Sequence, residues 1–303
     1  MSISKETLNK NLKSIFGFDS FRSDQEGIIL NLLKGNDSMV IMPTGGGKSM
    51  CYQLPALISK GCAIVVSPLI ALMKNQVDVL RGHYQNESIA HVLNSSLSKT
   101  QTNQVKEDIK SAKTKLLYVA PESLVKEEHI EFFRNVTISF YAIDEAHCIS
   151  EWGHDFRPEY RNLKRIVDDI GEAPIIALTA TADSLTQNDI CKQLDLDQPD
   201  LYKASFNRSN LSLTVLPGKD KFKTISNFIH QRQGQCGIIY CLSRKNTEQL
   251  SLKLKKSGIK AAHYHAGLST DKRSKTQEDF INDKIDIICA TIAFGMGIDR
   301  SNV

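Results

Sequence analysis

Two short groups of residues in this 303-residue chain have the types and spacing that phosphate chemistry needs. The first is PTGGGKS, Pro43 to Ser49, which follows the apolar run SMVIM and precedes MCYQLPALIS, a segment typical of a helix. Successive glycines let backbone N–H groups converge on phosphate oxygens, while the lysine adds charge and the serine offers a hydroxyl to Mg²⁺. Met42 replaces the first glycine of the general phosphate-loop pattern, and a Gly-rich turn formed by chance is the alternative. The residues predicted to bind nucleotide phosphates are Thr44, Gly45, Gly46, Gly47, Lys48 and Ser49.

The second group is YAIDEAH, residues 141–147, at the end of an apolar run. Asp144 is placed to hold Mg²⁺ and Glu145 to orient an attacking water. Adjacent carboxylates repel each other, so a bound cation explains their pairing better than a solvated acidic turn after ISFYAI would. Lys48, Asp144, Glu145 and His147 are the predicted catalytic residues.

The elements that must position these residues follow an alternating pattern. Apolar runs separated by helical stretches of mixed polarity are typical of buried parallel strands joined by crossover helices. They occur at 38–42, 62–67, 115–120, 138–144 and 174–179, and again at 236–240, 261–264 and 286–290. Between these sets, 196–212 is polar and has little periodicity, which predicts the domain boundary there. The expected fold is therefore α/β with mainly parallel sheets, in domains 1–205 and 206–303.

Composition and charge narrow the class of protein. Hydrophobic residues make up 41% of the chain and charged residues 24%, as in a globular protein, and no leader or membrane-length apolar run occurs. Residues 206–303 hold 16 Lys and Arg against 8 Asp and Glu, whereas residues 1–205 hold 22 against 26. The basic second part suggests a face for a polyanion, with an ordinary solvated surface as the alternative.

The seven cysteines show no CxxC pairing or zinc spacing. They are interpreted as reduced core thiols of a cytoplasmic protein, with Cys236 and Cys241 as a weaker candidate pair of metal ligands. No zinc site is expected in the chain.

The order of motifs resembles that of the superfamily 2 helicases, and within them the RecQ family of DNA helicases. The segment DEAHCISEWGHDFRPEY, residues 144–160, is the most specific, and the resemblance covers nearly the whole chain. Further matching segments are FGFDSFRSDQ (16–25), MPTGGGKSMCYQLP (42–55), SPLIALMKNQVD (67–78), LNSS (93–96), YVAPE (118–122), ALTATA (177–182), FNRSNL (206–211), GIIYCLSRKNTE (237–248), YHAGL (264–268) and ATIAFGMGID (290–299).

This resemblance implies two RecA-like P-loop domains, the second incomplete at its C-terminus. It also implies that ATP and Mg²⁺ drive 3′ to 5′ movement on single-stranded DNA and unwinding of forked duplex DNA, in repair and recombination, at the nucleoid if the source is bacterial. Phe18, Arg22 and Gln25 would then form the adenine pocket, through stacking and base-edge hydrogen bonds. Phe16 and Phe21 are interpreted as core residues.

The resemblance further implies an aromatic-rich loop that senses single-stranded DNA. Trp152 and Phe156 offer faces for bases, and Arg157 offers a charge for phosphate. The alternative is a tryptophan packed beneath a loop. Short polar residues that resemble the family's DNA path or interdomain link are Ser67, Asn75, Asn94, Ser95, Ser96 and Thr179 to Thr181.

The chain stops three residues after Arg300 of GMGIDR, within an expected βα unit. The resemblance implies that an arginine reaching the nucleotide would follow Val303, and that without it unwinding is weak or absent. The alternative function is therefore a nucleotide-dependent DNA-binding fragment with little turnover.

Overall fold

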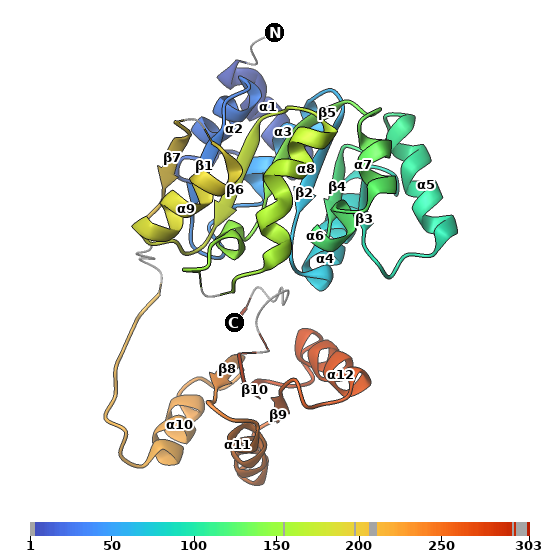
Figure 1. Cartoon of the computed structure of the whole chain (residues 1–303). Helices are drawn as coiled ribbons and strands as arrows, with labels where there is room; N and C mark the ends of the chain where they lie inside the picture. Colours follow the sequence, from blue (N-terminus) through green and yellow to red (C-terminus); the bar gives the residue numbers. More distant parts are fainter. Residues whose placement is uncertain (1–3, 154, 197, 206–210, 293, 295–301) are drawn as a thin grey trace. The chain divides into compact units, whose positions relative to one another are not determined.

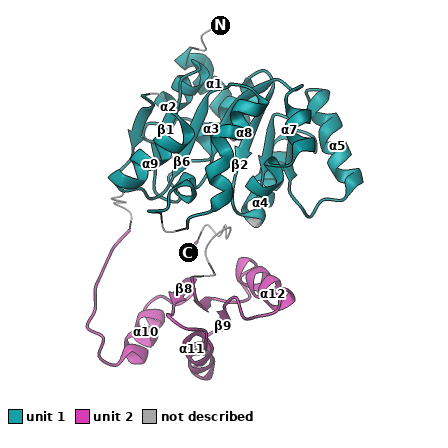
Figure 2. Ribbon diagram, viewed as in Figure 1, with its two compact units in different colours: residues 1–210 teal, residues 211–303 magenta. Residues whose placement is uncertain are grey.

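The structure is a computed structural model that describes residues 4–153, 155–196, 198–205, 211–292, 294 and 302–303. Contacts within the chain divide it into two compact units, Met1–Asn210 and Leu211–Val303 (Figure 2). The expected boundary between residues 205 and 206 borders the stretch 206–210, which lies outside the described residues.

The first unit contains a seven-stranded sheet in the order β3-β4-β2-β5-β6-β1-β7 (Figure 1). Every pairing between neighbouring strands is parallel, which confirms the expected α/β fold class. The strands are β1 (Ser38–Ile41), β2 (Cys62–Val66), β3 (Ala90–Leu93), β4 (Leu116–Val119), β5 (Ile138–Ile143), β6 (Ile175–Thr179) and β7 (Asp200–Lys203).

Helices cover both faces of this sheet, so that each central strand is buried on both sides. Along β1 the side chains alternate, with Met39 and Ile41 in one apolar cluster and Val40 in the other. Helices α2, α3 and α4 pack on the Val40 side, and α5 to α9 supply the Met39 side. The helices are α1 (Lys5–Phe16), α2 (Gln25–Leu33), α3 (Met50–Ile58), α4 (Ile70–Tyr84), α5 (Lys99–Lys110), α6 (Pro121–Leu124), α7 (Glu127–Phe133), α8 (Leu163–Ile170) and α9 (Ser184–Leu194), with short 3₁₀ helices η1 (Ala146–Ile149) and η2 (Pro158–Asn162).

Two strands of this sheet were not expected from the sequence. β3 and β7 are the two edge strands, and β7 falls inside the stretch 196–212 in which the domain boundary was predicted. An edge strand pairs on one side only and needs no continuous apolar run. Three of the four β7 residues are exposed, yet the strand pairs with β1 over its full length. The alternating strand pattern thus continues into residues 200–203 of the first unit.

The second unit contains a three-stranded parallel sheet in the order β8-β10-β9. Its central strand alternates, since Ile288 and Ala290 join one apolar cluster and Ile287 and Cys289 the other. The segment GMGID at 295–299 lies outside the described residues. The elements are α10 (Lys221–His230), β8 (Gly237–Tyr240), α11 (Arg244–Lys256), β9 (Ala261–Tyr264), α12 (Thr270–Ile281) and β10 (Ile287–Ala290).

All seven cysteines are free thiols. Cys51, Cys62, Cys148 and Cys289 are buried, as expected of core thiols, and the other three are half-buried. Burial raises the pKa of Cys51 to about 12, which makes its thiolate scarce near neutral pH. Across the part of the chain that the structure describes, we find no helix of the length and apolarity needed to cross a membrane.

Candidate functional site

The glycine loop joins the end of β1 to the start of α3, in the order that phosphate binding requires. Gly45 and Gly47 adopt positive φ values of 77° and 87°, which other residues rarely tolerate. A side chain at Gly46 would meet the Pro43 carbonyl oxygen at 2.8 Å, and one at Gly47 would collide with Gln25. Lys48 Nζ donates to the Met42 carbonyl oxygen at 3.1 Å, so the ammonium group lies at the end of β1. The loop geometry thus depends on these glycines.

Gln25, one of the three residues predicted to form the adenine pocket, contacts this loop. Gln25 is buried, and its Nε2 donates to the Gly47 carbonyl oxygen at 3.0 Å while its Oε1 accepts from the Arg22 backbone N–H at 2.8 Å. Phe18 is 48% exposed and free to stack, whereas Phe16 and Phe21 pack against the core, as expected. In this structure Gln25 therefore holds the phosphate loop, a link that the sequence did not indicate.

Asp144 follows β5 and is only 8% exposed. Burial raises the pKa of this carboxyl to about 7, the adjacent Glu145 adds to the rise, and the Lys48 ammonium opposes it. The Glu145 backbone N–H donates to Asp144 Oδ1 at 3.0 Å, and the Tyr160 hydroxyl donates to the Asp144 carbonyl oxygen at 3.2 Å. A buried carboxylate whose charge is this unfavourable suits a site that receives a cation.

Replacing Asp144 by Asn should raise the melting temperature of the nucleotide-free, Mg²⁺-free chain by several degrees at pH 8. The pKa of Asp144 is raised from 3.8 to about 7, so ionising it opposes folding, and the stability present below about pH 4 is lost as pH rises through 7. Removing the charge should increase the free energy of unfolding by on the order of a few kcal/mol at pH 8, and by progressively less toward pH 4. Differential scanning calorimetry across this range measures the effect.

The matched control is Asp78→Asn, which removes an exposed carboxylate from α4 of the same unit. It should leave the melting temperature almost unchanged at every pH. An Asp144→Asn gain that is absent, or that does not depend on pH, would contradict the assignment of a charged, buried Asp144.

Glu145 and His147 lie close together immediately after Asp144. Glu145 has a positive φ of 50°, and its Oε2 lies 3.3 Å from His147 Nδ1. His147 Nδ1 also lies 3.0 Å from the Thr179 hydroxyl at the end of β6. Because the Met42 backbone N–H donates to the Thr179 carbonyl oxygen at 3.1 Å, β6 connects the acidic segment to the glycine loop. The predicted catalytic residues thus meet at one edge of one sheet.

The aromatic-rich loop rests directly on the acidic segment. A side chain at Gly153 would collide with the His147 carbonyl oxygen, and the Arg157 backbone N–H donates to the Cys148 carbonyl oxygen at 2.9 Å. Arg157 Nη1 donates to the Pro68 carbonyl oxygen at 3.2 Å, which joins the loop to the segment after β2. The loop is therefore in direct contact with the segment that carries Glu145 and His147.

The two aromatic side chains of this loop are exposed to solvent. Trp152 is 73% exposed, so the alternative of a tryptophan packed beneath the loop is wrong. Phe156 is 37% exposed, with the Arg161 guanidinium 5.5 Å from its ring centre. An exposed indole and a half-exposed phenyl ring on one loop provide faces on which bases could stack.

The other polar candidates follow β2 and β3, two parallel strands that are separated by β4 in the same sheet. Ser67 follows β2 and is buried, and its hydroxyl has no hydrogen-bond partner among the described residues. Asn94 follows β3 and accepts from the Ser96 backbone N–H and hydroxyl at 2.9 Å and 2.6 Å, which shapes the turn that carries the exposed Ser95. Asn94 therefore shapes the turn, while Ser95 remains open to solvent.

A buried polar chain behind the glycine loop was not predicted. Gln53 Nε2 donates to Gln76 Oε1 of α4 at 2.7 Å and to the Tyr118 hydroxyl at 3.1 Å. Tyr118 packs edge-on against Tyr52, whose hydroxyl interacts with Ser49. These polar contacts link Ser49, the expected Mg²⁺ ligand, to α4. No local sequence signal marks them, because Gln53 and Tyr118 are 65 residues apart.

The residues present fit a nucleotide with Mg²⁺. The glycine loop has a backbone that side chains at positions 46 and 47 would disturb, and Asp144 is a buried carboxylate near the Lys48 ammonium. Ser49 and Asp144 supply the oxygen ligands that Mg²⁺ prefers.

Comparison with known proteins gives consistent matches. Residues 22–190 match the DEAD/DEAH box helicase family, and residues 220–303 match the helicase conserved C-terminal domain. The chain is 46% identical over 301 residues to the ATP-dependent DNA helicase RecQ of Haemophilus influenzae, covering 99% of this chain and 48% of that protein. It is 42% identical over 294 residues to the RecQ helicase of Bacillus subtilis, covering 96% of this chain and 49% of that protein. The chain thus spans about half the length of these relatives.

Solved structures share the fold at low sequence identity. The helicase MrfA bound to DNA superposes with a TM-score of 0.74 at 18% identity, over 99% of this chain and 46% of that one. The Mycobacterium smegmatis helicase Lhr, bound to single-stranded DNA and AMP-PNP, superposes with a TM-score of 0.71 at 18% identity, over 98% of this chain and 42% of that one.

Proposed function

The chain belongs to the DEAD/DEAH box helicase family and, within it, to the RecQ helicases, and from this premise we propose that it uses ATP to move on and unwind DNA. The observation that carries the proposal is the aromatic loop seated on the acidic segment, with Gly153 against the His147 carbonyl oxygen. A surface able to stack on bases and a site able to hydrolyse ATP are thereby in mechanical contact within the first unit.

Hydrolysis would use the residues gathered at the carboxyl edge of the first sheet. Backbone N–H groups of residues 45–49 and the Lys48 ammonium would hold the phosphates, and Phe18, Arg22 and Gln25 the adenine. Mg²⁺, held by Ser49 and Asp144, would neutralise charge that develops on the phosphates. The Glu145 carboxylate would orient the attacking water and accept its proton, and His147 would fix Glu145 relative to Thr179.

DNA binding would be coupled to hydrolysis through the same contacts. A base stacked on Trp152 would shift the loop, and the loop bears on the segment that carries Glu145 and His147. Ser67, Asn94 and Ser95 lie at the same strand ends and would hold the DNA backbone without reading its sequence. Arg157, bonded to Pro68, would keep the loop in register with that path.

The finer features of the function follow the family. We propose movement in the 3′ to 5′ direction on single-stranded DNA, unwinding of forked duplexes, and a role in repair and recombination. A DNA substrate would place the protein in the cytoplasm, at the nucleoid in a bacterial cell.

Single-stranded DNA should stimulate the ATPase activity of the chain by at least about tenfold. The expected stimulation reflects stacking worth roughly 1–3 kcal/mol per base at the Trp152 loop. Steady-state hydrolysis with and without a homopolymeric DNA strand measures it. ATP binding with no stimulated turnover would instead favour the alternative, a nucleotide-dependent DNA-binding module.

Salt provides the control for this experiment. Contacts to phosphates release counterions, so the DNA concentration for half-maximal stimulation should rise at least about tenfold between roughly 50 and 200 mM NaCl. Strands of different sequence should behave alike, because phosphate contacts carry no sequence information. A flat salt profile would contradict binding through the DNA backbone.

A further inference from the structure

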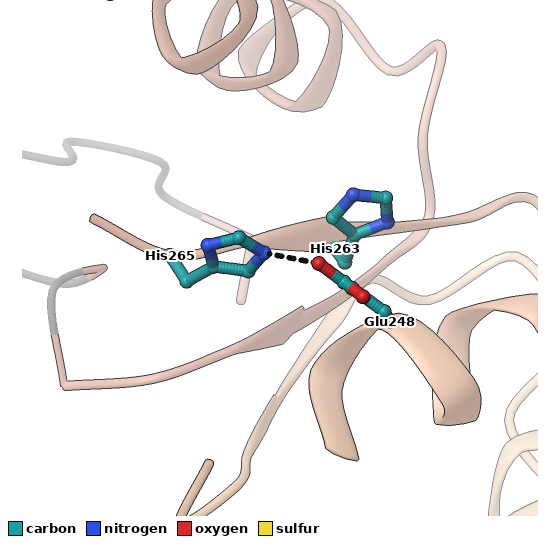
Figure 3. Close-up of side chains that lie close together, drawn as sticks. All are labelled: Glu248, His263 and His265. Atoms are coloured by element: carbon teal, nitrogen blue, oxygen red, sulfur yellow. Dashed lines mark hydrogen bonds and ion pairs between the residues drawn. The ribbon is translucent and has the colours of Figure 1, made fainter. Parts of the chain in front are cut away.

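Three side chains of the second unit that have no part in the proposed mechanism lie close together. Glu248 comes from α11, His263 from β9 and His265 from the turn that follows β9 (Figure 3). Each offers one ligand atom, and these three atoms all lie within 4.8 Å of one another. The group thus joins a helix to a strand that begins five residues after the helix ends.

Local structure explains why the side chains converge. Ser243 caps α11 by accepting from the Asn246 backbone N–H, which fixes the first turn of the helix and hence Glu248. Positions 263 and 265 are two residues apart along an extended segment, so both imidazoles project to the same side. Their rings are stacked, with centroids 5.6 Å apart and an interplanar angle of 15°.

The contacts within the group already resemble a partly assembled ligand set. His265 Nε2 lies 3.0 Å from Glu248 Oε1, and two ligands bound to one tetrahedral ion lie roughly 3.3 Å apart. His263 Nδ1 makes one long contact of 3.3 Å, to the Ser251 hydroxyl. Only His263 would have to move appreciably for the three atoms to surround one ion.

Burial and orientation define which nitrogen of His265 faces the cluster. His265 is 4% exposed, and its Nδ1 has no hydrogen-bond partner among the described residues. The buried ring therefore directs Nε2, and not Nδ1, at Glu248, so Nε2 is the atom available to an ion beside that carboxylate.

We propose that Glu248, His263 and His265 form a binding site for a divalent transition-metal ion such as Zn²⁺. Two imidazoles and one carboxylate are a donor set that suits zinc and its neighbours, and that does not suit Mg²⁺ or Ca²⁺, which prefer oxygen ligands. The ion would replace the hydrogen bond between His265 and Glu248 and recruit His263. Three protein ligands leave a fourth position for water, and the bound ion would tie α11 to β9.

This site departs from the expectation that the chain holds no zinc. That expectation rested on the cysteines, whereas the cluster contains none. Glu248 is 15 residues from His263 and 17 residues from His265, and it belongs to a different element. The spacing of the three residues therefore matches no short metal motif.

The test is isothermal titration of Zn²⁺ into the complete chain, without nucleotide or Mg²⁺ and with a phosphine reductant. The wild-type chain should bind with micromolar or tighter affinity at this site. His263→Ala and Glu248→Gln should each weaken that binding by at least about tenfold, since one of the three protein ligands is lost. Zinc should also raise the melting temperature of the wild-type chain more than that of either variant.

Two features keep the result decisive. Glu248→Gln keeps an oxygen that can accept from His265, so the hydrogen bond and the fold should persist while the carboxylate ligand is lost. His230→Ala removes an exposed histidine of the same unit outside the cluster and should bind zinc as the wild type does. Equal affinity in all four proteins, or no binding up to about 100 µM Zn²⁺, a free energy near −5.5 kcal/mol, would show that Glu248 and His265 form only a hydrogen-bonded pair.

Cobalt gives a second readout, because its spectrum reports which kinds of atoms bind the ion. Co²⁺ bound by imidazoles and a carboxylate shows weak visible bands, whereas thiolate ligands add an intense near-ultraviolet band. The wild-type chain should show the visible bands without the thiolate band, and Glu248→Gln should lose them. A dominant thiolate band would assign the ion to the cysteines and overturn the site.

Discussion

Replacing Glu145 by Gln should reduce ATP turnover by about 10²- to 10⁴-fold while leaving the affinity for Mg-ATP close to that of the wild-type chain. Gln keeps the size of the side chain and removes the carboxylate that is proposed to accept the proton of the attacking water. The backbone of Glu145 has a φ of 50°, and Gln tolerates that conformation about as Glu does, so the local structure should persist. Asp144 and Lys48, which are proposed to hold metal and phosphate, are untouched.

The measurement combines turnover in the presence of single-stranded DNA with titration of a fluorescent ATP analogue. Lys48→Ala is the informative comparison, because it should weaken nucleotide binding as well as hydrolysis. Glu151→Gln is the matched control, since Glu151 is an exposed carboxylate six residues away that pairs with Arg161 at 3.4 Å. A Glu145→Gln protein with near wild-type kcat would overturn the role assigned to Glu145.

Replacing Trp152 by Ala should remove most of the stimulation of ATPase by DNA and leave the DNA-free rate nearly unchanged. The indole is 73% exposed, so its removal costs little packing and should not lower the melting temperature. It is expected to provide a stacking face for a base, worth roughly 1–3 kcal/mol, or about 5- to 150-fold in DNA affinity. Gly153, which seats the loop on His147, is unchanged in this variant.

Rates over a range of DNA concentrations separate weaker DNA binding from a lost response to bound DNA. Leu185→Ala is the matched control, because Leu185 is an exposed apolar residue on α9 of the same unit and lies outside the loop. It should keep full stimulation. If Trp152→Ala lowers the basal and stimulated rates equally, the tryptophan supports the fold and does not sense DNA.

The central strands of both sheets could be predicted from the sequence because they are buried on both faces. A parallel strand covered by helices on each side consists of consecutive apolar residues, as CAIVV at β2 and IIALT at β6 illustrate. The edge strands β3 and β7 carry polar residues such as His91 and Asp200, because one side of each lacks a neighbouring strand. Their sequences therefore resemble those of connecting segments.

The phosphate loop and the acidic segment could also be recognised locally. Their chemistry requires particular residue types within a few positions of a strand end, so Gly45 to Ser49 and Asp144 to His147 carry their signal in consecutive residues. The family resemblance rests on the same sequence motifs, above all on residues 144–160. Exposure of Trp152 agrees with the polar residues around it.

Only the tertiary structure could decide which distant groups meet. The insertion of β6 between β5 and β1 places Thr179 where it contacts His147 and holds Met42. Burial against the sheet sets the raised pKa of Asp144, a property of its surroundings that residue identity cannot convey.

The same holds for the contacts that no motif marks. Gln25 bonds the Gly47 carbonyl oxygen across 22 positions, and Gln53 reaches Tyr118 across 65. The cluster of Glu248, His263 and His265 forms because α11 packs against β9. Sequence encodes such groups only through the packing of whole elements, which depends on the summed burial of many side chains rather than on any short pattern.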